Sequence, residues 1–192
     1  MMDLMLDETA TTGGMNALAL EAAAGSRAAF SRLVSENYDL IHRVALKWSG
    51  NRDDAEDIAQ TVCVKLGQAI RSFRGEARFS TWLYRLTINA AQDHHRARAR
   101  DTARTQAFMA QALVEAQPGK PGWPPEDETE ALWAAVRQLP EKTRDAVLLV
   151  YGEEMSHADA ARVLDCKEAT VSWHVHDAKK RLAALLRADG ET

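Results

Sequence analysis

The chain has 192 residues, 46% of them apolar, and a formal net charge of −4 at pH 7. This length and apolar content allow a buried core, arranged as one domain or two, and two small domains fit best. The weak net charge excludes a uniformly basic nucleic-acid-binding protein, so any basic surface must be local.

The N-terminal segment MMDLMLDETATTGG has no basic region followed by a long apolar run, and no other stretch reaches the length of a membrane span. We therefore expect a cytoplasmic protein without membrane insertion. Residues 1–14 are expected to form a disordered tail. Met1, Met2 and Met15 are alternative starts, because Met15 directly precedes the first helical pattern.

Apolar residues recur at three- and four-residue steps along most of the chain, and alternating apolar and polar runs are missing, which predicts an all-α fold. Asp54 with Asp57 resembles a capping box, and Ser80 is expected to cap the next helix. The predicted helices span residues 15–24, 27–48, 55–71, 80–100, 129–138, 141–151, 157–164 and 168–187.

Residues 101–128 lose this periodicity. The segment 117–125 holds four of the five prolines, and residues 111–130 carry five acidic side chains against one lysine. This composition predicts a flexible acidic linker. It separates a first domain, residues 15–100, from a second domain, residues 129–188.

Residues 71–104 carry the opposite charge, with eight arginines against three acidic residues. Trp82 and Tyr84 lie in the same stretch. Aromatic faces beside guanidinium groups form a platform for unstacked bases, and the loop 73–78, with Gly75 allowing a sharp turn, can present a pocket for an extruded base. The alternative is that Trp82 anchors the core and the arginines form a solvated face.

A second pattern lies near the C-terminus. Ser156 with Asp159 begins a short apolar helix, a turn follows at residues 165–167, and a longer helix begins at Glu168. This is the helix-turn-helix arrangement, whose second helix can enter the major groove of DNA. An ordinary helical hairpin with a polar outer face fits the same pattern.

Together these segments resemble a bacterial sigma-70 family RNA polymerase sigma factor of the extracytoplasmic-function (ECF) class. The stretches AFSRLVSENYDLIHRVA, DDAEDIAQTVCVKL and FRGEARFSTWLYRLTINAAQDHHRARAR resemble region 2, and LPEKTRDAVLLVYGEEMSHADAARVLDCKEATVSWHVHDAKKRL resembles region 4. The resemblance implies a helical bundle and a helix-turn-helix domain. It also implies a factor that binds core RNA polymerase, recognises a promoter and promotes its melting, for genes that respond to stress or a signal.

The resemblance further implies partners and site residues. The partners are promoter DNA, an anti-sigma factor, and the β′ clamp coiled coil and β flap of core RNA polymerase. The polymerase-binding residues are Asp54, Glu56, Asp57 and Gln60. The residues expected at the minus-ten element are Phe73, Arg74, Arg78, Phe79, Ser80, Trp82, Arg85, Asn89 and Arg96. Those expected at the minus-thirty-five element are Ser156, His157, Thr170, Ser172, Trp173, His174, His176 and Lys179.

Two other classes of function remain open at the level of sequence. A helix-turn-helix regulator would bind DNA through residues 129–187 without polymerase docking. An enzyme would use Cys166, His174 and His176 as metal ligands, or His94 and His95 as a base. We expect no enzyme, metal or cofactor, because no paired carboxylates, nucleophile elbow or phosphate loop accompanies these residues, and Cys63 and Cys166 lack partners at zinc-finger spacing.

Overall fold

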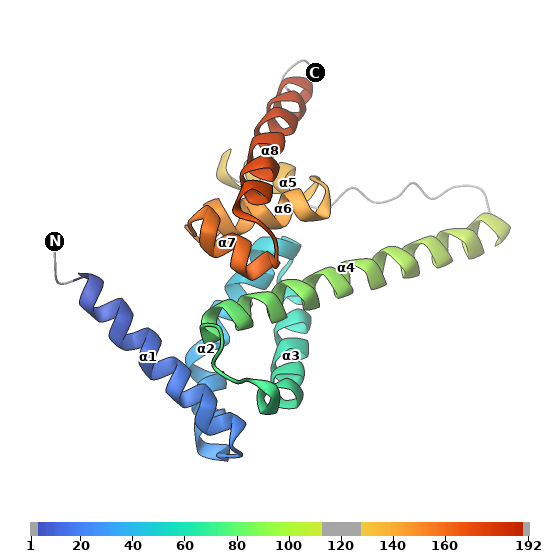
Figure 1. Ribbon diagram of the computed structural model, residues 1–192. Coiled ribbons are helices and arrows are strands. Elements are labelled where there is room, and N and C mark those ends of the chain that lie inside the picture. The colour runs from blue at the N-terminus through green and yellow to red at the C-terminus, as the bar shows by residue number, and fades with distance from the viewer. Residues whose placement is uncertain (1–3, 113–127, 190–192) are drawn as a thin grey trace.

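The computed structural model describes the backbone of residues 4–112 and 128–189, and the side chains of residues 13–102 and 131–184. Every regular element in these ranges is helical (Figure 1). The all-α prediction is therefore confirmed for the described residues. The segment 113–127, which forms most of the expected linker, lies outside them.

The N-terminal domain is built around α2 (Arg27–Ser49), which packs against α1 (Leu4–Ala23), α3 (Arg52–Ala69) and α4 (Phe79–Ala112). Ser26 caps α2 by accepting a hydrogen bond from the amide of Ala29, and Gly50 ends it with a φ of 69°. A left-handed backbone at this position favours glycine. A short helical turn, η1 (Ile70–Ser72), follows α3 and leads into the loop before α4.

The C-terminal domain consists of α5 (Glu128–Arg137), α6 (Glu141–Val147), η2 (Leu148–Gly152), α7 (His157–Leu164) and α8 (Glu168–Asp189). η2 continues α6 as a π-helical turn. Asp165 ends α7 in the left-handed conformation, and this tight turn directs α8 across α6 and α7. The helices predicted for this half of the chain are all present.

Several helix ends differ from the sequence prediction. α1 begins at Leu4, so residues 4–14 are helical where a disordered tail was expected; they include strong helix formers, and each internal glycine costs only about 1 kcal/mol. α4 continues past residue 100 to Ala112, because no Pro or Gly interrupts it. The cap of α3 is Asn51, which accepts from the amide of Asp54, and Ser80 lies inside α4.

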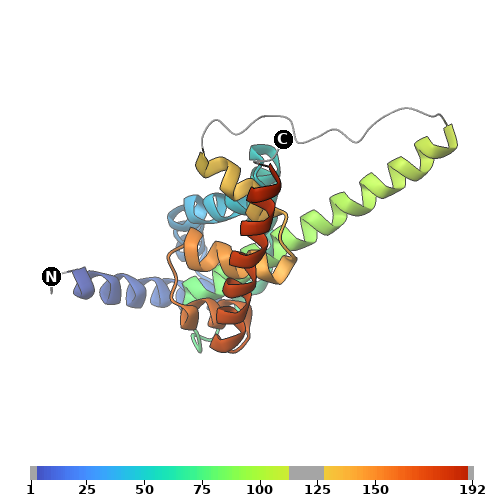
Figure 2. The ribbon, with the colours of Figure 1, turned by 90° about the horizontal axis from the view of Figure 1, so that it is seen from above.

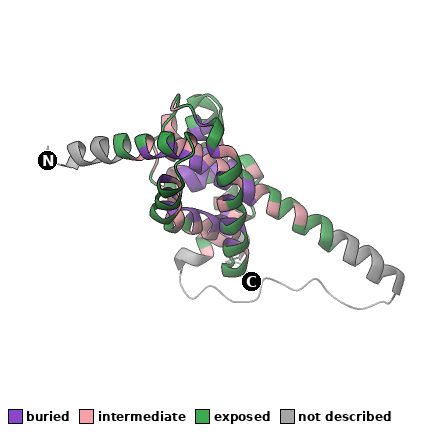
Figure 3. Cartoon of the chain, turned by 90° about the horizontal axis from the view of Figure 1, so that it is seen from below, coloured by how far each residue is buried: buried purple, intermediate pink, exposed green. Residues whose placement is uncertain are grey.

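The two domains share their apolar core. Val44, Tyr84 and Ile88 of the N-terminal domain cluster with Leu149 and Ala160 of the C-terminal domain. Seen from above, α7 and α8 lie over the first turns of α4, while the rest of α4 extends away from both domains (Figure 2). Buried residues gather where the helices of the two domains pack together (Figure 3).

Candidate nucleic-acid interface

An exposed acidic and amide surface follows one side of α3. Glu56, Asp57 and Gln60 are all exposed, as the amphipathic pattern predicted. Asp54 differs, because its carboxylate forms an ion pair with Arg98 of α4 and lies 3.9 Å from Nε2 of His94. The surface available to a partner on α3 therefore consists of three of the four expected side chains.

A hollow of about 320 Å³ opens at the N-terminus of α4. The loop before α4 bends at Gly75, whose φ of 74° is the left-handed conformation that glycine adopts without strain. Arg74 and Arg78 are exposed on this loop. The residues lining the hollow are Ser72, Phe73, Arg74, Gly75, Glu76, Ala77 and Trp82.

Three aromatic rings pack together beside this hollow, and two of them, Phe73 and Trp82, line it. Phe73, Phe79 and Trp82 have ring centroids 5.7 to 5.8 Å apart. Phe79 is completely buried, so its ring is not accessible to a base in this conformation. Trp82 is only half-buried and lines the hollow. Phe79 therefore anchors the core, and Trp82 offers the accessible aromatic face.

Further along α4, the expected DNA-binding side chains contact the C-terminal domain. Arg85 donates hydrogen bonds to the carbonyl oxygens of Arg162 and Val163, at 2.6 and 3.0 Å. Arg96 pairs with Glu141 at 3.2 Å. Both cations lie on α4 as predicted, and in this arrangement they contact α6 and α7 while their side chains remain partly exposed.

A carboxylate of the C-terminal domain inserts between α2 and α4. The side chain of Glu153 is 5% exposed and accepts from Arg43 at 3.0 Å, Lys47 at 2.8 Å and the hydroxyl of Tyr84 at 2.8 Å. Burial opposes its ionisation, but these three donors hold the pKa of Glu153 below its ordinary value. Burial and the neighbouring carboxylate raise the pKa of Tyr84, which keeps its hydroxyl a donor.

A second buried carboxylate joins the domains at Asp145 of α6. It accepts hydrogen bonds from Nε1 of Trp48 at 2.8 Å and from Nε2 of Gln92 at 2.7 Å. The guanidinium of Arg144 lies 3.8 Å above the Trp48 ring. Burial raises the pKa of Asp145 to about 6, against the opposing effect of its hydrogen bonds.

Sequence reasoning did not identify Glu153 or Asp145. Asp145 is a single acidic residue before an apolar run, and Glu153 follows such a run as the first of two glutamates, patterns that are typical of solvated positions. Their role depends on the packing of the two domains, which no local pattern encodes.

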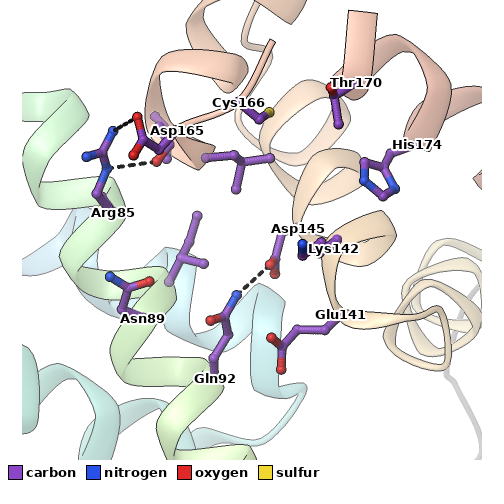
Figure 4. A pocket seen from close by; sticks show the side chains of 13 residues that line it. Arg85, Asn89, Gln92, Glu141, Lys142, Asp145, Asp165, Cys166, Thr170 and His174 are labelled. Carbon is purple, nitrogen blue, oxygen red and sulfur yellow. Dashed lines mark hydrogen bonds and ion pairs between the residues drawn. The ribbon is translucent and has the colours of Figure 1, made fainter. Parts of the chain in front are cut away.

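A hollow of about 470 Å³ separates α4 from the C-terminal helices. Figure 4 shows Asn89 and Gln92 on one wall and Glu141, Lys142 and Asp145 on the opposite wall. His174 and Thr170 of α8 also line it, although the sequence placed both on an outward DNA-facing surface. His174 shares a 3.0 Å hydrogen bond with Thr143, and burial lowers its pKa.

The helix-turn-helix pattern is present as predicted. Ser156 caps α7 through the amide of Asp159, and the Nδ1 atom of His157 lies 2.8 Å from the hydroxyl of Ser172. Val171 and Val175 of α8 are buried against the domain. Trp173 is 59% exposed. Exposed side chains on α8 also include Thr170, Ser172, His176, Lys179 and Lys180.

Comparison with known proteins identifies the family. A model of sigma-70 region 2 matches residues 33–101, and a model of sigma-70 region 4 matches residues 129–182. The RNA polymerase sigma-H factor of Pseudomonas aeruginosa is 31% identical over 85% of this chain and 91% of its own. The ECF RNA polymerase sigma factor SigM of Mycobacterium tuberculosis is 34% identical over 85% of this chain and 80% of its own. The chain belongs to the ECF family of RNA polymerase sigma factors.

Two solved structures share the fold of this sigma factor. CnrH, solved in complex with the cytosolic domain of CnrY, has a TM-score of 0.64 and 24% identity, over 91% of this chain and 97% of its own. RpoE of Bartonella quintana, solved with the anti-sigma factor NepR, has a TM-score of 0.62 and 23% identity, over 83% and 98%. In this sigma factor, α2, α3 and the first part of α4 form region 2, and α5 to α8 form region 4.

The remaining features of the sigma factor concern metals, thiols and membranes. No group of three or more His, Cys, Asp or Glu side chains is arranged to hold a metal ion within the part of the chain that the structure describes. Both cysteines are free thiols, and burial raises the pKa of Cys63. None of the described helices is long and apolar enough to cross a membrane. The family is not a class of enzymes.

Proposed function

We propose that this ECF sigma factor, which binds core RNA polymerase and directs promoter-specific initiation, holds an unpaired base of the minus-ten element in the hollow at the start of α4. The observation that carries the proposal is the accessible face of Trp82 at this hollow, beside the exposed Arg74 and Arg78. A base that leaves the duplex loses its stacking partners, and an aromatic face restores part of that energy.

The charges around the hollow suit the same task. Arg74 and Arg78 lie on the loop itself and are free of ion pairs within the described residues. Contacts between arginine and phosphate fix the path of a strand without selecting its sequence. The hollow supplies selection, because only an unstacked base reaches it. This combination favours capture of one strand as the promoter melts.

Docking on polymerase is assigned to α3. The exposed side of α3 presents the acidic and amide groups of Glu56, Asp57 and Gln60. The other side of the helix is buried in the core through Ile58 and Val62. Such a face complements a basic helical surface, as expected for the β′ clamp coiled coil. The β flap is the proposed partner of region 4, and we expect the factor to catalyse no reaction of its own.

Reading of the minus-thirty-five element is assigned to α8. Ser172, Trp173 and His176 are exposed on this helix, and Lys179 is an exposed cation that could bind a phosphate. A tryptophan at such a position offers an apolar contact to a thymine methyl group, whereas serine and histidine can bond base edges. His174 is left out of this assignment because it faces the interdomain hollow.

DNA binding by the expected face of α4 requires a change of conformation. The residues concerned are Arg85, Asn89 and Arg96. All three were expected to contact minus-ten DNA, but Arg85 and Arg96 bind region 4 and Asn89 lines the interdomain hollow. The two domains must separate before this face of α4 can contact a strand. We call the arrangement in which region 4 packs on α4 the closed arrangement. Promoter binding and the closed arrangement therefore compete for the same side chains.

An anti-sigma factor is the proposed regulatory partner. RpoE of Bartonella quintana, which shares this fold, was solved in complex with the anti-sigma factor NepR. A protein that stabilised the closed arrangement, or covered α3, would keep this sigma factor from core polymerase. Copurification of the factor from its own cells, followed by transcription with the copurified protein, tests this assignment.

Run-off transcription with core RNA polymerase tests the proposed function as a whole. The templates are a library of duplex fragments and the same fragments with a pre-melted segment. Transcripts that start at a common sequence and require the factor are expected, with little duplex binding by the free chain. Dimeric, sequence-specific duplex binding without polymerase, and no factor-dependent transcript, would instead support a plain helix-turn-helix regulator.

A further inference from the structure

The N-terminal helix α1 contacts the loop that forms the base-binding hollow. Two of its side chains, Asn16 and Leu20, are four residues apart and therefore lie on one face of the helix. That face meets the loop 73–78 at its bend and meets the start of α4, which follows the loop. Neither residue belongs to the range 33–101 that matches sigma-70 region 2.

Asn16 binds the end of the loop that leads into α4. Its Oδ1 atom accepts a hydrogen bond of 2.7 Å from the backbone amide of Phe79, the first residue of α4. The first amides of a helix have no partner within it, so a side-chain acceptor at this point stabilises the start of the helix. Here the acceptor comes from a residue 63 positions earlier.

Leu20 lies against the other part of the loop. A Cβ atom placed at Gly75 would lie 3.6 Å from both methyl carbons of Leu20, which is ordinary van der Waals distance. The bend at Gly75 is therefore packed against α1. Leu20 is nevertheless 43% exposed, so this contact lies at the surface rather than in the core.

The amide of Phe79 is close to the aromatic wall. Phe79 packs against Phe73 and Trp82, and the amide of Trp82 bonds the carbonyl oxygen of Arg78 in the first turn of α4. A shift of the first turn would therefore move the Trp82 ring relative to the loop. The hydrogen bond from Phe79 to Asn16 fixes this turn from outside region 2.

We propose that Asn16 is a positioning residue for promoter melting, which acts by holding the first turn of α4 so that Trp82 faces the hollow. Asn16 touches no DNA in this account. The inference rests on the proposed function of the hollow. It predicts a specific loss in melting when the acceptor is removed, without loss of the fold or of polymerase binding.

The test compares three variants in holoenzyme assembled with core RNA polymerase. Asn16→Ala removes the acceptor, Asn16→Asp retains an acceptor and adds a charge that a helix N-terminus favours, and Trp82→Leu removes the aromatic face. The probe is a promoter fragment chosen by run-off transcription, with 2-aminopurine in the minus-ten segment of the non-template strand. Its fluorescence reports base unstacking.

Asn16→Ala is expected to lower the unstacked fraction about fivefold, as the loss of a cap would, and Asn16→Asp to restore it. Affinity for core polymerase and the melting temperature of the free factor should change little. Unstacking as in the native factor, or equal failure of Asn16→Asp, would overturn the inference, as would unfolding of region 2 by Asn16→Ala. If Trp82→Leu lost unstacking and Asn16→Ala did not, only the proposed role of Asn16 would be overturned. Native unstacking in Trp82→Leu would overturn the base-binding hollow.

Discussion

The hydroxyl of Tyr84 on α4 donates a 2.8 Å hydrogen bond to Glu153 across the boundary between regions 2 and 4. Arg43 and Lys47 of α2 bond the same carboxylate. One acidic side chain of region 4 is thus held by three donors of region 2. A substitution at Glu153 is therefore a direct way to weaken the closed arrangement.

Glu153→Gln should loosen the closed arrangement. The amide keeps the shape of the side chain but loses the charge and one acceptor oxygen. Breaking a charged hydrogen bond typically costs about 1.5 to 3 kcal/mol, but Arg43 and Lys47 are partly exposed, so about 1 kcal/mol is expected.

The measurement for Glu153 is the urea concentration at which energy transfer between dyes on the two domains is half lost. It should fall in Glu153→Gln and remain unchanged in Glu154→Gln, which alters the exposed neighbour. Equal midpoints for both variants would show that Glu153 does not hold the domains together.

Asp145 should give the protein a pH-dependent stability. Its pKa is raised by burial to about 6, so the folded state binds more protons than the unfolded state between pH 4 and 6. Stability from this group is therefore present at low pH and lost as the pH rises through 6. From pH 7.5 to pH 5, the native protein should gain on the order of 1 kcal/mol relative to Asp145→Asn.

Urea unfolding of both proteins at several pH values checks this prediction. Burial lowers the pKa values of His95 and His174, so their protonation lowers stability as the pH falls. Both proteins contain these histidines, so the difference between the two proteins removes this contribution. A constant difference between native protein and Asp145→Asn across this pH range would mean that Asp145 does not titrate there.

Much of the fold followed from the sequence, because helical periodicity and caps are local. The helix of residues 27–48 and the cap at Ser156 were predicted close to where the structure has them. The starts of α1 and α3 were not predicted. For α3, Asn51 and Asp54 can both serve as the cap, and nothing local decides between them.

The site was predicted less completely than the fold. Exposure of Glu56, Asp57 and Gln60 followed from helix amphipathicity. The roles of Phe79 and Trp82 did not, because two aromatic residues three positions apart lie on one face, and only the packing of Phe73 decides which is buried. The engagement of Arg85 by region 4 depends on contacts between residues far apart in the chain.

Polymerase docking should depend on α3. Asp57→Lys combined with Gln60→Ala is expected to weaken binding to core polymerase about tenfold, because a charge reversal on a complementary face replaces attraction by repulsion. Asp39→Lys, an exposed charge reversal on α2, is the matched control. Pull-down with immobilised core polymerase measures both, and equal retention of the two variants would exclude this docking face.

Substitutions at Trp82 and at Phe79 should have different effects, the first on promoter melting and the second on the stability of region 2. Trp82→Leu keeps an apolar side chain in the cluster but loses the stacking face, so melting should fall by one to two orders of magnitude, equivalent to about 1 to 3 kcal/mol. Phe79→Ala should instead destabilise region 2 by about 3 to 5 kcal/mol, since Phe79 is fully buried.

Permanganate reactivity of promoter thymines and thermal unfolding distinguish these two losses. Trp82→Phe should recover most of the melting that Trp82→Leu loses. If Trp82→Leu and Trp82→Phe melted the promoter as the native factor does, Trp82 would be a core residue only.

The central claim is that one face of α4 binds region 4 in the free factor and a DNA strand in the initiation complex. The direct measurement is energy transfer between dyes on Asp39→Cys of α2 and Lys180→Cys of α8, in a chain whose Cys63 and Cys166 are replaced by serine. Transfer should be high in the free factor and fall when core polymerase and a promoter are added. Transfer that stays at the free value in a complex shown to make transcripts would contradict the claim.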